Sequence, residues 1–165
     1  MTKQKTLFML IGPKGSGKTH IGTLIDQHTD IAFLRVEPIW LRLNPNENGW
    51  EKVEATIDAM FKNCNKVMIE SLGAGDAFSK FYASLAEKYS IKMIRVYANL
   101  ETCFTRVKTR SDVDHLSVSD EKVIEFNRIA AAVTYNWSLE INNDIPASDK
   151  DIINAIQSIN HVEGE

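Results

Sequence analysis

The feature that most constrains this chain is the stretch "GPKGSGKT" at residues 12–19, which matches the pattern G-x-x-x-x-G-K-[ST] at every position. A continuously apolar run, "TLFMLIG", leads into it over residues 6–12 and is typical of a buried strand. After it, side chains at i, i+3, i+4 and i+7 from Ile21 to His28 mark one helix face, which predicts a helix over residues 17–28. The sequence therefore places a glycine-rich loop between a strand and the start of a helix.

Each residue type in this loop has a physical reason to hold phosphate. Glycines allow successive backbone N–H groups to turn inward as an anion-binding nest, and the following helix points its positive end at the same place. The Lys18 ammonium adds a point charge for the β- and γ-phosphates, and the Thr19 hydroxyl is a suitable ligand for Mg²⁺. The dinucleotide fingerprint G-x-G-x-x-G does not fit, because His20 stands at its last glycine. We therefore expect the whole loop to bind a nucleotide: Gly12, Pro13, Lys14, Gly15, Ser16, Gly17, Lys18 and Thr19.

Strand and helix patterns alternate along the rest of the chain. Short apolar runs predict further strands over residues 31–37, 66–70, 91–98 and 137–142, the last with the alternation of an edge strand. Helical spacing predicts helices between them, including one from about residue 101 and one over residues 120–134. This alternation is typical of a three-layer α/β/α domain built on a five-stranded parallel sheet.

Composition and charge narrow the possible functions. The chain has 165 residues, 44% apolar and 25% charged, values typical of one globular domain over residues 1–165. A formal net charge of −3 argues against nucleic acid as a partner. Two distant cysteines fit a reducing compartment, and the apolar run near the N-terminus is too short for a signal peptide or a membrane span. The sequence therefore predicts a cytoplasmic protein without a membrane partner, present as a monomer or homodimer.

Two acidic residues stand where predicted strands end. Glu70 ends the third strand, and its carboxylate lies beside the glycine-rich loop if the two strands are neighbours. We interpret it, together with Thr19, as a magnesium ligand. Glu37 ends the second strand, just before Pro38, and we interpret it as the group that takes a proton from, or binds, a phosphoryl acceptor. A solvated carboxylate is the alternative for either residue.

Two arginines and two tryptophans complete the set of candidate residues. Arg106 and Arg110 are four residues apart and share one helix face next to a polar loop, which suits a lid that closes on phosphates. A solvated basic face is the alternative. Trp40 and Trp50 flank a turn-rich stretch, and we expect them to pack in the core rather than to line a pocket.

With these residues, the sequence resembles the P-loop kinases of small molecules, the nucleoside-monophosphate-kinase-like group that includes shikimate, gluconate and polynucleotide kinases. The resemblance covers most of the chain and rests on "GPKGSGKT", "VMIES", "TRVKTR", "HLSVSDEKVIEFN" and "INNDIPASDKDIINAI", of which only the first is highly specific. It implies the strand order 2-3-1-4-5 and ATP with Mg²⁺ as the phosphoryl donor. It further implies an acceptor held by residues 37–62, a lid over residues 106–118 with Arg106 and Arg110 on phosphate or adenine, and an adenine bordered by residues 142–146.

The acceptor itself does not follow from the resemblance. The triple glycine that follows the third strand of shikimate kinases is replaced by "SLGAG", and the paired aspartates after their second strand are missing. The sequence therefore predicts an ATP-dependent phosphotransferase that acts on a small hydroxyl- or phosphate-bearing molecule. Its predicted catalytic residues are Lys18, Glu37, Arg106 and Arg110. Two alternatives stay open: a nucleotide-binding switch or slow NTPase, and a polynucleotide kinase.

Overall fold

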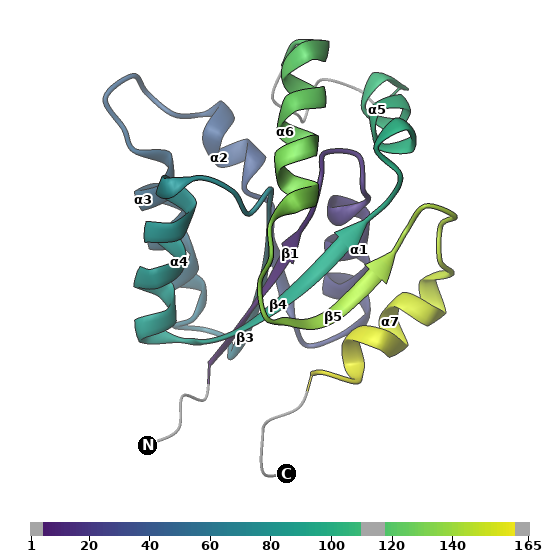
Figure 1. Cartoon of the computed structure of the whole chain (residues 1–165). Coiled ribbons are helices and arrows are strands. Elements are labelled where there is room, and N and C mark those ends of the chain that lie inside the picture. Colours follow the sequence, from purple (N-terminus) through teal and green to yellow (C-terminus); the bar gives the residue numbers. More distant parts are fainter. Residues whose placement is uncertain (1–4, 110–117, 161–165) are drawn as a thin grey trace.

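The structure of the protein is a computed structural model that describes residues 5–109 and 118–160 (Figure 1). At its centre lies an all-parallel five-stranded sheet in the order β2-β3-β1-β4-β5. The parallel sheet and its strand order are therefore confirmed. The strands are β1 (Thr6–Ile11), β2 (Ala32–Leu34), β3 (Lys66–Ser71), β4 (Ser90–Tyr97) and β5 (Trp137–Asn142).

Helices cover both faces of this sheet. Figure 1 shows α3 and α4 on one side of it and α1 and α7 on the other, which confirms the predicted three-layer α/β/α architecture. No helix in the described part of the chain is both long enough and apolar enough to cross a membrane. The helices are α1 (Lys18–His28), α2 (Glu37–Leu41), α3 (Gly49–Met60), α4 (Asp76–Lys88), α5 (Leu100–Thr109), α6 (Asp120–Ala132) and α7 (Asp149–Gln157).

The central strand β1 is anchored in the core on both of its faces. Leu7, Met9 and Ile11 pack with side chains of α3 and α4. Phe8 and Leu10 point the other way and pack with side chains of α1 and α7, as the two-residue period of a strand requires. All five side chains are buried, so the end of β1, where the glycine-rich loop begins, is held in place from both sides.

The second strand is shorter than the sequence predicts. β2 ends at Leu34, and Glu37 is the first residue of α2 rather than the last residue of a strand. Pro38 explains the difference: its fixed φ and missing N–H interrupt a strand, but they suit the first turn of a helix equally well. The prediction that Glu37 ends the second strand is therefore wrong. Glu70 also stands one residue before the end of its strand, since β3 continues to Ser71.

The structure describes only part of the predicted lid. α5 ends at Thr109, so Arg110 and most of residues 106–118 lie outside the described residues. The two helices that flank this segment are connected by an ion pair, in which the Lys108 ammonium at the end of α5 lies 3.0 Å from the carboxylate of Asp120 at the start of α6. Of the predicted lid arginines, the structure therefore places Arg106 alone.

Candidate functional site

The glycine-rich loop makes a tight turn between β1 and α1. Gly15 and Gly17 have φ angles of 85° and 103°, in the left-handed region that other residues avoid. A Cβ atom on Gly15 would lie 2.2 Å from the carbonyl oxygen of Cys103, and one on Gly17 would lie 2.2 Å from Nδ2 of Asn143. Glycine is therefore required at both positions, because the loop backbone packs directly against α5 and the residue that follows β5.

The start of α1 is open to an anion. The helix begins at Lys18, and no side chain in the described part of the protein caps its first N–H groups. These groups and the positive end of the helix dipole therefore remain available at the loop. The neighbouring Ser16 is fully buried, and its hydroxyl has no hydrogen-bond partner among residues 5–109 and 118–160. The loop thus offers several donors for one negatively charged ligand.

Lys18 is held almost completely inside the protein, with 8% of it exposed. Its ammonium donates hydrogen bonds to the carbonyl oxygens of Gly12 and Pro13 at 2.5 and 2.9 Å, so the side chain folds back across the loop. Burial lowers the pKa of Lys18 from its ordinary 10.5 to about 8, against the opposing effect of the Glu70 carboxylate. An ammonium that has lost most of its water interacts strongly with phosphate oxygens, because the surroundings screen its charge poorly.

Glu70 of β3 is in contact with Thr19 at the start of α1. Glu70 lies opposite Leu10 in the β1–β3 pairing, and its Oε1 accepts a hydrogen bond from the Thr19 hydroxyl at 2.8 Å. Burial raises the pKa of Glu70, while the Lys18 ammonium and the Thr19 hydrogen bond act in the opposite direction. Its Oε2 is buried and has no hydrogen-bond partner in the described ranges. One carboxylate oxygen and one hydroxyl are therefore placed where a hard cation, or water bound to it, would find oxygen ligands.

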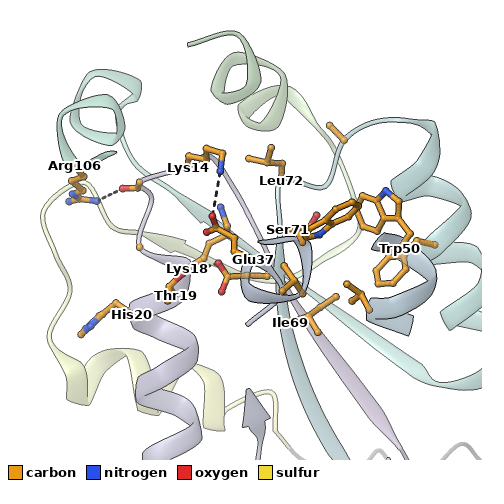
Figure 2. Close-up of a pocket in the computed structure, with 18 residues that line it drawn as sticks. Lys14, Lys18, Thr19, His20, Glu37, Trp50, Ile69, Ser71, Leu72 and Arg106 are labelled. Atoms are coloured by element: carbon orange, nitrogen blue, oxygen red, sulfur yellow. Dashed lines mark hydrogen bonds and ion pairs between the residues drawn. The ribbon is translucent and has the colours of Figure 1, made fainter. Parts of the chain in front are cut away.

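Glu37 reaches the loop from α2. Its Oε2 lies 3.9 Å from the Lys14 ammonium, and both side chains are largely buried. In Figure 2 the Glu37 carboxylate lies between the loop residues on one side and Trp50 on the other. Glu37 therefore belongs to a helix rather than to a strand end, but it still lies beside the glycine-rich loop.

Arg106 fastens the loop to the segment after β5. Its Nη1 donates to the Gly15 carbonyl at 3.2 Å, and its Nη2 donates to the carbonyls of Asn143 and Asp144 at 2.8 and 3.2 Å. A guanidinium carries five N–H donors, so these contacts leave others for a ligand. The structure therefore brings Arg106, the loop and part of residues 142–146 together.

Two buried asparagines hold the loop, and sequence reasoning missed both of them. Asn127 of α6 accepts a hydrogen bond from the Lys14 N–H at 2.8 Å and donates one to the Lys14 carbonyl at 2.9 Å. Asn143 donates to the Ser16 carbonyl at 2.9 Å. Asn127 could have been found, because it shares the buried face of α6 with apolar residues, and a polar side chain there needs a partner. Asn143 lies in an irregular segment that no such period marks.

Replacing Asn127 with alanine should destabilise the protein. Two partly buried backbone groups of Lys14 lose their partner, which costs about 1–3 kcal/mol. For a chain of this size, that loss lowers the melting temperature by roughly 2–12 °C in a thermal denaturation experiment. Glu125→Ala, at an exposed position of the same helix, is the matched control and should melt with the wild type. Identical melting of the wild type and the Asn127→Ala variant would show that the clamp contributes nothing.

Lys18, Thr19, Glu37, Glu70 and Arg106 all border one cavity of about 430 Å³ (Figure 2). Trp40 and Trp50 are half-buried and line it too. The predicted core packing holds for Trp50, which contacts Phe78 and Phe81, but both tryptophans also form part of the pocket wall. The described lining consists of Lys14, Gly15, Gly17, Lys18, Thr19, His20, Val36, Glu37, Trp40, Trp50, Val53, Ile69, Glu70, Ser71, Leu72, Ala74, Phe81 and Arg106.

Comparison with known proteins finds likeness in structure only. No protein-family model and no curated protein matches this chain. The Pnkp1/Rnl/Hen1 RNA repair complex contains a chain with a TM-score of 0.66 at 16% identity, and the match covers 79% of this chain and 45% of that one. A sugar kinase from Janibacter sp. HTCC2649 has a TM-score of 0.63 at 15% identity, with 93% of each chain covered. The APS kinase of Mycobacterium tuberculosis, solved with AMPPNP and APS, has a TM-score of 0.61 at 12% identity. The match covers 98% of this chain and 100% of that one.

These identities are too low to assign an activity, but the agreement in structure extends over nearly the whole chain in two of the three comparisons. The sheet order, the position of the glycine-rich loop between β1 and α1, and these likenesses agree with one another. The chain therefore has the α/β fold of the P-loop kinases.

Proposed function

We propose that this protein is an ATP-dependent phosphotransferase that moves the γ-phosphoryl group of ATP to a small hydroxyl- or phosphate-bearing acceptor. The observation that carries the proposal is that one cavity is lined by Lys18, Thr19 and Glu70 near the loop, by Glu37, and by side chains of α3 and α4. Transfer needs room for a donor and an acceptor beside one another, and the likeness in fold to kinases supports this assignment. A nucleotide switch would need only the part of the cavity next to the loop.

The donor end accounts for most of the loop residues. Backbone N–H groups between Gly12 and Thr19, with the Lys18 ammonium, would hold the β- and γ-phosphates. Arg106, and Arg110 beyond the described residues, would contact phosphate or adenine. Thr19 and Glu70 would hold Mg²⁺, which fits their oxygen atoms and the orphaned Oε2 of Glu70. The metal ion would supply positive charge against the phosphate oxygens during transfer.

Glu37 would act at the boundary between donor and acceptor. The acceptor oxygen forms a bond to the γ-phosphorus of ATP, and the bond from that phosphorus to the β–γ bridging oxygen breaks. When the acceptor group is a hydroxyl, its proton passes to the Glu37 carboxylate, and the products are ADP and the phosphorylated acceptor. The nearby Lys14 ammonium holds the carboxylate in place.

We assign this activity to one domain over residues 1–165. Residues 37–62, which include α2 and α3, would bind the acceptor, since they supply Glu37, Trp40, Trp50 and Val53 to the cavity. Residues 106–118 would form the lid. We also propose that the protein belongs to the cytoplasm, since its two distant cysteines fit a reducing compartment.

A polynucleotide kinase is the second candidate, because the RNA repair complex is among the structural likenesses. The net charge of −3 argues against it, since binding to nucleic acid relies on cations that displace counterions from the phosphates. Salt dependence separates the two candidates: transfer to an oligonucleotide should weaken steeply between low and physiological salt, whereas transfer to an uncharged small molecule should not.

A screen for ADP release over small metabolites and oligonucleotides tests these candidates directly. We expect at least one small molecule to raise ADP release about tenfold or more above basal hydrolysis, because acceptor positioning is the main barrier that such a site lowers. The Lys18→Ala variant, as the matched control, should show no stimulation. A rate that no small molecule or oligonucleotide raises would instead identify a slow NTPase, and stimulation by oligonucleotides alone would identify a polynucleotide kinase.

A further inference from the structure

The cavity is apolar at the end away from the glycine-rich loop. Its walls there come from α2 and the residue before it, from α3, from β3 and from α4: Val36, Trp40, Trp50, Val53, Ile69 and Phe81. In the view of Figure 2, Trp50 and Ile69 lie on one side of Glu37, and Arg106 and His20 lie on the other. The apolar wall continues into the buried cluster between the sheet and α3 and α4, so the core holds it firmly.

The two tryptophans of this wall are fixed in position. Their rings meet edge to face, with centroids 5.4 Å apart and planes at 82°. Gly49, the first residue of α3, makes room for Trp40, since a Cβ atom there would lie 2.1 Å from the indole ring. Because Trp40 lies directly on the backbone of α3, it cannot retreat from the cavity. Trp50 is held in turn by Phe81, at 4.9 Å between ring centroids.

The lysine and arginine side chains of the described cavity lining gather at its other end. Lys14 and Lys18 belong to the loop, and Arg106 belongs to the end of α5. Among the described lining residues, no lysine or arginine comes from α2, α3, β3 or α4. A carboxylate or phosphate bound at the apolar end would therefore lose its water against walls to which the described lining contributes no lysine or arginine, which is strongly unfavourable. A polyol would likewise leave several hydroxyls without partners.

We infer that the acceptor is an uncharged alcohol whose body is an apolar or aromatic ring. The ring lies against Trp40, Trp50 and Ile69, and the hydroxyl points toward Glu37. Apolar contact supplies the binding energy, while the single hydroxyl supplies the orientation. This inference rests on the proposed function, and it narrows the acceptor to one class: the alcohol loses its proton to Glu37 as its oxygen bonds to the γ-phosphorus and ADP leaves.

Indole N–H resonances provide a direct test on the whole chain labelled with ¹⁵N. The protein has three tryptophans, and Trp137, at the start of β5, lies outside the described lining. The probes are 2-(1-naphthyl)ethanol, its carboxylate counterpart 1-naphthylacetate, and D-glucose. We expect the alcohol to bind with a Kd of about 1 mM or below, in line with the usual binding free energy per non-hydrogen atom. It should shift the indole resonances of Trp40 and Trp50 and leave that of Trp137 in place.

The charge and polarity of the probes decide between classes of acceptor. We expect 1-naphthylacetate and D-glucose to bind about tenfold more weakly than the alcohol, or more weakly still, because neither finds a partner for its polar groups on this wall. Trp40→Phe and Trp50→Phe assign the resonances. Binding of 1-naphthylacetate or D-glucose as tight as that of the alcohol, or a shift at Trp137 instead, overturns the inference.

A glycine substitution tests the wall without removing either tryptophan, whose loss could unfold the protein. Gly49→Ala should displace the Trp40 ring, because the added methyl group would overlap with it. We expect this displacement to weaken binding of 2-(1-naphthyl)ethanol by about fivefold or more. ATP affinity should stay unchanged. Leu41→Ala is the control, because Leu41 lies next to Trp40 but is 46% exposed and outside the lining, and it should alter neither ligand. Equal weakening by both variants, or by neither, contradicts the inference.

ADP release separates this inference from the function on which it rests. If naphthylethanol binds as expected but nothing in the acceptor screen stimulates ADP release, the phosphotransferase proposal fails while the ring site stands. If D-glucose or an anionic acceptor stimulates ADP release and leaves the Trp40 and Trp50 resonances in place, the function stands and the inference fails.

Discussion

Lys18→Met should abolish phosphoryl transfer and leave the protein at least as stable as the wild type. Loss of one preorganised charge at a transferring phosphoryl group lowers kcat by about 10²–10³-fold or more. Burial lowers the pKa of Lys18 from 10.5 to about 8, which corresponds to a cost of roughly 3 kcal/mol for keeping the ammonium charged in the folded protein. Methionine retains the apolar stem and removes that cost, although the bonds to Gly12 and Pro13 are lost and offset part of the gain.

The pH dependence of the free energy of unfolding shows whether the buried charge of Lys18 is the reason that Lys18→Met is stable. Below about pH 8 the Lys18 side chain is protonated in both the folded and the unfolded wild type, so the folded protein bears the full cost of the buried ammonium. Between about pH 8 and 10.5 the unfolded chain binds the proton and the folded chain releases it, so the wild type gains stability as the pH rises. The advantage of Lys18→Met over the wild type should therefore shrink across that window. Urea unfolding at pH 7 and pH 10 measures it.

An exposed lysine provides the matched control for this prediction. Lys80 is exposed on α4, so Lys80→Met should change neither kcat nor the pH dependence of the free energy of unfolding. Retained turnover in Lys18→Met would show that the loop is not the transfer site. Destabilisation by several kcal/mol at pH 7 would show that the buried ammonium stabilises the fold, contrary to the direction of its pKa shift.

The fold was predictable because its signals are local. The apolar run of β1 and the glycine spacing that follows it identify a strand, a loop and a helix without knowledge of the rest of the chain. The strand order, in contrast, came from family resemblance, since periodicity alone does not say which strands are neighbours. Pro38 shows the limit of local reasoning: it marks a boundary, and only packing decides whether a strand ends there or a helix begins.

Local patterns pointed to several residues of the site, but not to the contacts that these residues make. Thr19 and Glu70 are 51 positions apart, and their hydrogen bond depends on β1 and β3 being neighbours. The clamp of Asn127 on Lys14 spans 113 positions. The position of Trp40 against Gly49 depends on the angle between two helices, which no periodicity reports. Sequence patterns therefore identified the end of the cavity at the glycine-rich loop, whereas its apolar end required the folded chain.

Glu70→Gln should remove most of the magnesium-dependent activity while stabilising the protein in the absence of ligands. The amide keeps the shape of the side chain and can still accept the hydrogen bond from Thr19, but it lacks the charge that a hard cation prefers. We expect kcat to fall by about 10²-fold or more, as for other losses of electrostatic stabilisation at a phosphoryl group. Measuring ADP release over a series of Mg²⁺ concentrations should show that more metal only partly restores the activity.

The stability of this variant follows from the sign of the pKa shift. Burial raises the pKa of Glu70, so the folded protein holds the ionised carboxylate at a cost, and its contribution to stability declines as the pH rises through that raised pKa. Glu70→Gln removes this decline, and its advantage in melting temperature should be present at pH 7 and absent at a pH below the ordinary range of a glutamate. Glu87→Gln, exposed on α4, is the control and should match the wild type in both measurements. Because an ATP–Mg²⁺ complex stabilises only a protein that binds it, the complex should raise the melting temperature of the wild type. An equal rise in the melting temperature of Glu70→Gln would exclude Glu70 from the metal site.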